Sequence, residues 1–399
     1  MGSPDPIHAR QLNGMGGGVS SLSKICVVGE KGSLTGRSEC RDDIDVEYTF
    51  AQVGIRDEVI DYSGNCGNLS SVVGVFAVDE GMCSPRVIDN STGQIHSRGT
   101  VRLFNTNTNK HIDTTFPLTP LDSDGLSTSR RFADLGIPEE SVAGVPGLAS
   151  RIDLDFTNPA GARTGKLFPT GNVQEDLHVR IPPDDTLNVG RNRDEISISA
   201  TLIDAANPSV FIRHDDLVRV LQDLNILSRP TIIDLTETID FSLPPISKLV
   251  ECIRRTGAKH MGLDPSIQAQ PKIAIARSTS ASDSDVYLTS FSMGVPHKAV
   301  PMTLGLCAGV AAGIEGTIVW DTIARTRRNF KKSNPGVDFN RLYQCRSAVT
   351  ETRLEHPSGV VDVGAVFETT TRSDHTQMKV LSARVVRTGR RLMQGLVWW

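Results

Sequence analysis

The chain has 399 residues, more than a single hydrophobic core usually serves, and we therefore expect two domains. Its 42 lysine and arginine residues stand against 46 aspartate and glutamate residues, which gives a formal net charge of −4. This balance provides no basic excess for nucleic-acid binding, so an anionic ligand must be held by local features of the chain. No apolar stretch is long enough to cross a membrane.

Short apolar runs separated by turn residues recur along the whole chain and predict a structure dominated by strands. Each run is rich in β-branched residues or alternates between apolar and polar positions, which is the pattern of a strand with one buried face. The predicted strands cover residues 24–30, 101–107, 151–156, 196–204, 209–213, 272–277, 285–293, 359–368 and 381–386.

Four segments predict helices, namely Asn68–Val78, Asp215–Leu224, Ile246–Arg255 and Met302–Ile314. The first and the last are weak copies of one another. Both have a serine or threonine near the start, a cysteine, small residues, an apolar helix and an acidic residue beside glycine at the end. A duplicated α+β unit, with one apolar helix enclosed by a sheet in each copy, explains this pattern. The alternative is chance similarity between two helices rich in small residues.

The cysteines indicate a reducing compartment. They are seven in number, scattered, and without a CxxC pair, so neither a disulfide framework nor a zinc site is expected. We therefore expect a cytoplasmic protein, with a mitochondrial location left open. Cys26, Cys252 and Cys307 lie on strand-like or apolar helical segments, and we assign them to the core.

Cys66 has a different setting, because it stands in "GNCGN" where the first predicted helix begins. The amides at a helix N-terminus carry partial positive charge, and glycine lets a ligand approach the backbone closely. A carboxylate can therefore bind the amides of Gly67 and Asn68, and the same field favours the thiolate of a cysteine placed there. The alternative is a small buried hydrophobic residue.

Lys24 follows the glycine-rich run "GMGGGVSSLSK", just before a predicted strand. This run lacks the spacing of a phosphate-binding loop. A lysine here is either an ordinary solvated residue at a strand end or a partly desolvated base.

Eight motifs occur in one order along nearly the whole chain: "GSPDP", "GMGGGVSSLSK", "DYSGNCGNLSS", "FPTGN", "DAANPSVF", "SMGVPHKA", "HPSG" and "RTGRRLMQG". Together they resemble the PrpF-type isomerases, which include 2-methylaconitate cis-trans isomerase, methylitaconate and aconitate Δ-isomerases, and 4-oxalomesaconate tautomerase. These enzymes are similar to diaminopimelate epimerase in fold.

The resemblance implies an α+β fold of two similar diaminopimelate epimerase-like domains. Each would be a β-sheet rolled around a central helix, with a cleft between the domains. We place the first domain at residues 1–195 plus 376–399 and the second at 196–375, with the last strand returning to the first domain. Relatives begin upstream with a strand and a "GGTSKG"-like loop, so we expect the chain as given to lack both.

The resemblance also implies the site residues. Lys24 and Cys66 match the family's acid/base pair, and we expect them to face each other across the cleft between the domains. Neither a metal nor a cofactor is expected. The two helix starts and the "HPSG" turn would hold substrate carboxylates. The implied substrate-binding residues are Ser21, Asn65, Gly67, Asn68, Thr303, Ser358 and Gly359. One departure is Leu304, which follows Thr303 where relatives have glycine and would crowd one carboxylate pocket.

These features predict a cofactor-independent isomerase of an unsaturated di- or tricarboxylic acid. A base removes an allylic proton, the charge spreads into the carboxylate, and the returning proton moves or rotates the double bond. We assign the base to Lys24 and the second proton carrier to Cys66, with the order of roles, the particular acid and homo-oligomerisation left open. The expected partner is this small polycarboxylate, with no nucleic acid and no membrane.

Two alternatives belong to other classes. The missing leading segment favours a non-catalytic accessory or binding protein that retains the fold. An amino-acid racemase or epimerase would use two opposed cysteines, and it is disfavoured because Cys66 alone has a glycine-flanked setting.

Overall fold

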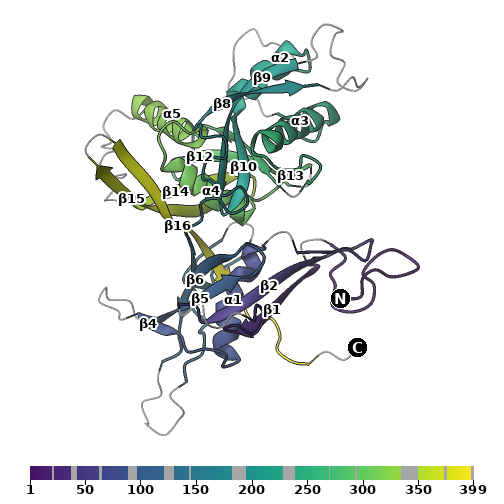
Figure 1. Ribbon diagram of the computed structural model, residues 1–399, viewed down its shortest axis with the longest axis vertical. Coiled ribbons are helices and arrows are strands. Elements are labelled where there is room, and N and C mark those ends of the chain that lie inside the picture. Colours follow the sequence, from purple (N-terminus) through teal and green to yellow (C-terminus); the bar gives the residue numbers. More distant parts are fainter. Residues whose placement is uncertain are drawn as a thin grey trace. The chain divides into compact units, whose positions relative to one another are not determined.

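The computed structural model describes residues 1–19, 22–36, 43–62, 65–88, 97–120, 130–142, 145–181, 195–227, 239–268, 270–292, 294–333, 349–372 and 375–396. It divides the chain into two compact units (Figure 1). The first unit comprises Met1–Thr157 and Val386–Trp399, and the second comprises Asn158–Val385. The domain boundaries expected from the sequence stay a prediction.

The first unit is a mixed sheet with one helix. Its elements are β1 (Lys24–Glu30), β2 (Val46–Val53), β3 (Ile60–Asp61), α1 (Gly67–Asp79), β4 (Arg86–Ile88), β5 (Arg98–Asn105), β6 (Lys110–Pro117), β7 (Ser150–Thr157) and the end of β16 (His375–Gly389). The strand order is β1-β2-β5-β6-β7-β16, with β3 paired to β2 and β4 paired to β5. The β2–β5 pair is parallel, whereas β1–β2, β5–β6 and β6–β7 are antiparallel.

Helix α1 packs against this sheet because most of its side chains are small and apolar. Val73, Ala77 and Val78 are at most 2 % exposed. Gly74 lets the helix approach closely, since a Cβ at this position would lie 3.2 Å from Phe116 and 3.3 Å from Val101. Glycine costs helix stability through backbone entropy, and here it brings the helix axis close to β5 and β6.

The second unit holds the remaining strands and four helices among its described residues. Its elements are β8 (Glu175–Arg180), β9 (Glu195–Ala205), β10 (Asn207–Arg213), α2 (His214–Asp223), α3 (Pro244–His260), β11 (Lys272–Arg277), β12 (Val286–Ser292), β13 (Val295–His297), α4 (Met302–Ala312), α5 (Ile318–Ser333), β14 (Val349–His356), β15 (Gly359–Arg372) and most of β16. The strand order is β16-β15-β14-β12-β11-β10-β9-β8, with β13 paired to β12.

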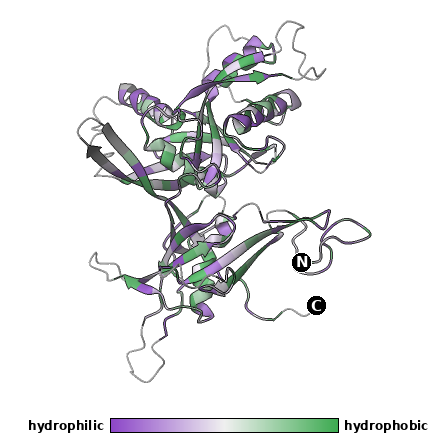
Figure 2. Cartoon of the chain, viewed as in Figure 1, coloured by the Kyte–Doolittle hydropathy of each residue, from purple (hydrophilic) through white to green (hydrophobic). Residues whose placement is uncertain are grey.

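Helix α4 is the central helix of this unit. Every residue from Met302 to Ala311 is buried, and the helix contacts β9, β10, β14 and β15. Apolar residues are common on α4 and on the strands around it, whereas α5 carries many hydrophilic residues (Figure 2). A helix that is apolar on all sides must be enclosed, because each exposed leucine or valine would forgo about 1.5–3 kcal/mol of burial free energy.

A second apolar cluster lies under α2 and α3. Leu217 and Leu221 of α2, and Leu249 and Ile253 of α3, are fully buried against β8–β12. Both helices are amphipathic, which is why the sequence pattern predicted them. In the part of the chain that the structure describes, no helix combines the length and apolar character needed to span a membrane.

Candidate active site

The two residues expected to act on protons lie side by side. Lys24 is the first residue of β1, and Cys66 is the residue before α1. The Lys24 Nζ donates a hydrogen bond to the Cys66 Sγ over 3.5 Å, and both side chains are partly buried. The pair lies within the first unit.

Cys66 adopts an extended backbone conformation, with φ −106° and ψ 105°, at the N-cap of α1. Its carbonyl accepts hydrogen bonds from the amides of Leu69 and Ser70, both at 3.0 Å. Its side chain does not cap the helix, and the first turn contains no acidic residue. The positive end of the helix is therefore not neutralised locally, and the first-turn amides beside the thiol can receive an anion.

A hydrogen-bond network behind the thiol holds the segment that carries it. The Tyr48 hydroxyl, on β2, is 2.8 Å from the Ser70 Oγ and donates to the Asn65 Oδ1 over 3.2 Å. The Ser70 hydroxyl also lies 3.1 Å from both the Asn65 Oδ1 and the Cys66 carbonyl oxygen. Burial raises the pKa of Tyr48, so this hydroxyl stays protonated and remains a donor.

No sequence motif pointed to a role for Tyr48 or Ser70. Tyr48 is fully buried, and a buried tyrosine hydroxyl needs a hydrogen-bond partner. A strand prediction at residues 46–53 would have placed Tyr48 on a buried face and raised the question of its partner.

Hydrogen bonds of Ser23, the buried residue before Lys24, fix the position of the start of β1. Lys24 pairs with Gln52 across β1 and β2, and the Gln52 side chain donates to the Ser23 carbonyl over 2.8 Å. The Ser23 hydroxyl bonds to the Gln11 side chain and to the Val19 carbonyl. The glycine-rich segment before β1 is thus tied to the strand, which limits the positions that Lys24 can take.

The other described cysteines have environments unlike that of Cys66. Burial raises the pKa of Cys26 to about 12, that of Cys307 to about 12 and that of Cys83 to about 11, while the pKa of Cys252 is also raised. Cys307 is fully buried, which confirms its assignment to the core, and Cys26 and Cys252 are partly buried. These thiols are therefore poor nucleophiles and poor proton carriers near neutral pH.

The structure assigns the predicted substrate-binding residues to two groups. Asn65, Gly67 and Asn68 surround Cys66 in the first unit, whereas Thr303, Ser358 and Gly359 belong to the second. Ser21 lies outside the described residues.

The second-unit candidates cluster around the start of α4. Thr303 is the second residue of α4 and is 8 % exposed. The Ser358 hydroxyl donates to the carbonyl of Lys298, in the segment that leads into α4, over 2.8 Å. Gly359, the first residue of β15, has φ 133°, a conformation that favours glycine, and pairs with His356 at the end of β14. Like α1, α4 has no acidic residue in its first turn and no side-chain cap.

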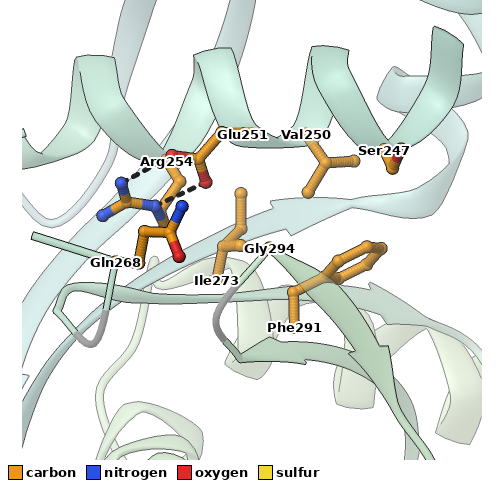
Figure 3. A pocket seen from close by; sticks show the side chains of 8 residues that line it. All are labelled: Ser247, Val250, Glu251, Arg254, Gln268, Ile273, Phe291 and Gly294. Atoms are coloured by element: carbon orange, nitrogen blue, oxygen red, sulfur yellow. Dashed lines mark hydrogen bonds and ion pairs between the residues drawn. The ribbon is translucent and has the colours of Figure 1, made fainter. Parts of the chain in front are cut away.

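A pocket in the second unit lies apart from these residues in the fold, between α3 and the β11–β12 strands (Figure 3). It is lined by Ser247, Val250, Glu251, Arg254, Gln268, Ile273, Phe291 and Gly294. The Arg254 guanidinium forms a bidentate pair with Glu251 and donates to the carbonyls of Pro265, Ile267 and Gln270. All its donor directions are used, so this arginine has a structural role.

The described residues contain no cluster of three or more histidine, cysteine, aspartate or glutamate side chains that could hold a metal ion. The site in the first unit therefore has as its reactive groups one amine and one thiol beside a helix N-terminus. Such an arrangement can take up and return a proton next to a bound carboxylate.

The family model described as "PrpF protein" matches residues 1–399. The chain belongs to the PrpF family, which confirms the resemblance seen in the motifs. It is 30% identical over 417 residues to a 2-methyl-aconitate isomerase of Shewanella oneidensis, covering 100% of this chain and 86% of that protein. It is 29% identical over 411 residues to a 3-methylitaconate isomerase of Eubacterium barkeri, covering 100% of this chain and 87% of that protein.

The fold agrees with this membership. The crystal structure of a methylitaconate-delta-isomerase matches with a TM-score of 0.65 at 27% sequence identity, covering 99% of this chain and 85% of that one. The predicted α+β class with a diaminopimelate epimerase-like fold is confirmed.

Proposed function

We propose that the chain is a cofactor-independent isomerase of unsaturated di- or tricarboxylic acids, in which Lys24 and Cys66 move one proton. The observation that carries the proposal is the 3.5 Å contact between the Lys24 Nζ and the Cys66 Sγ beside the uncapped start of α1.

The chemistry requires a base, an acid and fixed dipoles for an anion. Lys24 as the neutral amine takes a proton from the carbon next to a C=C–COO⁻ unit, and the charge spreads through the double bond into the carboxylate. The amides of Gly67 and Asn68 stabilise that charge. The Cys66 thiol gives a proton to the far end of the allylic system, which moves the double bond, and the Lys24 ammonium then returns the proton it took to the Cys66 thiolate across their 3.5 Å contact. If the proton returns to the original carbon after rotation, the result is cis-trans exchange.

The relatives support the reaction class and the kind of substrate. Proteins that resemble this chain over its whole length are named isomerases of 2-methyl-aconitate and of 3-methylitaconate, both of which are unsaturated polycarboxylates. The chain is accordingly an isomerase of unsaturated carboxylic acids, and none of these relatives favours the non-catalytic alternative. The particular acid is a matter for substrate screening.

We expect the protein to exchange allylic protons of cis-aconitate, itaconate or mesaconate with solvent. In D₂O, ¹H NMR should show loss of allylic signal together with appearance of the isomer. Propane-1,2,3-tricarboxylate has the same charge as aconitate but no double bond, and it should bind without exchange, because its C–H groups are not allylic. Binding of the unsaturated acids with no proton exchange for any of them would contradict the isomerase function and support the accessory-protein alternative.

Replacing Tyr48 by phenylalanine should loosen the Asn65–Cys66 segment and leave the fold intact. We expect a loss of about 1–2 kcal/mol in the free energy of unfolding, because the buried Ser70 and Asn65 groups lose a partner. We expect kcat to fall about tenfold with little change in KM, since a shift of the thiol affects the proton-transfer step more than binding.

Alkylation of Cys66 by iodoacetamide, followed by peptide mass spectrometry, reports the same displacement independently of turnover. The matched control is Tyr62→Phe, which removes the hydroxyl of a tyrosine that is 54 % exposed. An unchanged kcat and an unchanged Cys66 alkylation rate in Tyr48→Phe would show that the network has no positioning role.

A further inference from the structure

Arg387 is a half-buried charged side chain on β16, in the first unit. Val385 and Gly389, two residues before and after it, are buried, whereas Arg384 and Arg390 are exposed. Side chains at alternate positions of a strand share one face. Arg387 therefore points to the core side of the sheet.

This guanidinium has few partners for its five N–H groups. Among the described residues, its hydrogen bond is to the carbonyl of the neighbouring Val386, over 3.0 Å, and no carboxylate pairs with it. Burial lowers the pKa of Arg387 to about 10, so the group still carries its charge at neutral pH. Withdrawing a cation from water without an anion beside it is costly, and groups perturbed in this way cluster at functional sites.

Two contacts, one at the end of β16 and one just beyond it, follow the direction of α1. Arg391, two residues beyond the end of β16, pairs through its guanidinium with Asp79, the last residue of α1. At Gly389, a Cβ would lie 3.5 Å from Val72, in the middle of that helix. Following β16 backwards thus moves the contact from the end of α1 towards its start. Arg387 is the next residue back on this face, so we infer that its side chain is displaced in the same direction, towards the first turn of α1.

We propose that Arg387 binds a carboxylate of the substrate in a bidentate pair beside the first turn of α1. This inference rests on the proposed function, because it names the group that recognises a second or third carboxylate of the same acid. A planar guanidinium matches two carboxylate oxygens, and the first-turn amides cannot supply that geometry for a second carboxylate as well.

The test measures ligand binding and the stability of the ligand-free protein together. Arg387→Met keeps the length of the side chain and removes the charge. We expect the Kd for trans-aconitate, measured by calorimetry, to rise about 10- to 100-fold, as the loss of a charge-assisted pair predicts. The melting temperature without ligand should stay the same or rise, because the variant no longer buries an unpaired charge. Arg387→Lys should lose about tenfold in affinity, since it keeps the charge but not the bidentate geometry.

The matched control is Arg384→Met, on the exposed face of the same strand, which should leave the Kd unchanged. An unchanged Kd in Arg387→Met overturns the proposal. A fall in melting temperature in both Arg387 variants, with trans-aconitate binding retained, also overturns it. That result would show that Arg387 stabilises the folded protein and does not bind the acid.

Chemical modification of the unaltered protein tests the proposal without any variant. Phenylglyoxal labels arginine side chains, and peptide mass spectrometry reports each position. At a trans-aconitate concentration about ten times its Kd, labelling of Arg387 should slow about tenfold by mass action, while labelling of Arg384 stays the same. Equal labelling of Arg387 with and without ligand overturns the proposal. Failure of the unaltered protein to exchange allylic protons would instead refute the proposed function, and the binding data would still decide the role of Arg387.

Discussion

Replacing Lys24 by alanine is expected to reduce proton exchange into the substrate by about 10³- to 10⁴-fold, because the variant lacks the base that takes the allylic proton. The loss should fall on kcat. The protein should melt at nearly the same temperature, since the Lys24 side chain is partly exposed and its hydrogen bond among the described residues is a single 3.5 Å contact to the Cys66 sulfur. ¹H NMR of cis-aconitate in D₂O measures the exchange, and calorimetry shows whether the acid still binds.

Lys166→Ala, at an exposed lysine, is the control for removal of one positive charge. Small primary amines added to Lys24→Ala should restore part of the exchange, because the space left by the side chain can admit an external base. A Lys24→Ala protein that exchanges protons at the unaltered rate would remove Lys24 from the mechanism.

Replacing Cys66 by serine is expected to reduce turnover by about 10²- to 10³-fold while leaving a measurable remainder. A serine hydroxyl can still hydrogen-bond to Lys24 and to a carboxylate, but it gives up its proton far less readily than a thiol. Substrate affinity should change little, because the first-turn amides of α1 are backbone groups. Double-bond migration, followed by the NMR signals of the product isomer, measures the effect.

Cys83→Ser is the matched control for Cys66→Ser. Cys83 is partly buried, and burial raises its pKa to about 11, so its thiol stays protonated and unreactive. This variant should retain full activity. If Cys66→Ser and Cys83→Ser behaved alike, the second proton carrier would have to be another group.

The elements that the sequence predicted correctly have strong local patterns. Each predicted strand coincides with an observed one, and the four predicted helices are α1 to α4. These segments are either β-branched runs or clearly amphipathic or apolar helices, so a short window of sequence contains enough information.

Strand β2 ("VEYTFAQV") was missed although its pattern is typical of a strand, but several other missed elements lack such a pattern. Strands β6 ("KHIDTTFP"), β8 ("EDLHVR") and β14 ("VTETRLEH") are rich in polar and charged residues, and α5 ("IVWDTIARTRRNFKKS") carries many basic ones. Their conformation depends on neighbours. β14, for example, gains its hydrogen bonds from β15 and β12, which no local propensity contains.

The sequence by itself determined the family and, through it, the chemistry. A cysteine between glycine and asparagine at a helix start, a lysine after a glycine-rich run, and the order of the other motifs were enough to select Lys24 and Cys66. This was possible because these groups need a flexible backbone and unpaired backbone N–H groups nearby, and both features depend on residues adjacent in the sequence.

The tertiary structure alone decided which residues distant in sequence lie next to each other. It brings Lys24 to within 3.5 Å of Cys66, 42 positions along the chain, and sets Tyr48 behind Asn65. It also places Arg387, from the last strand, on the same face of β16 as the buried Val385 and Gly389, with no carboxylate among the described residues to pair with its charge. Strand pairing and helix packing set these neighbours, and both are interactions between segments far apart in sequence, which no local pattern encodes.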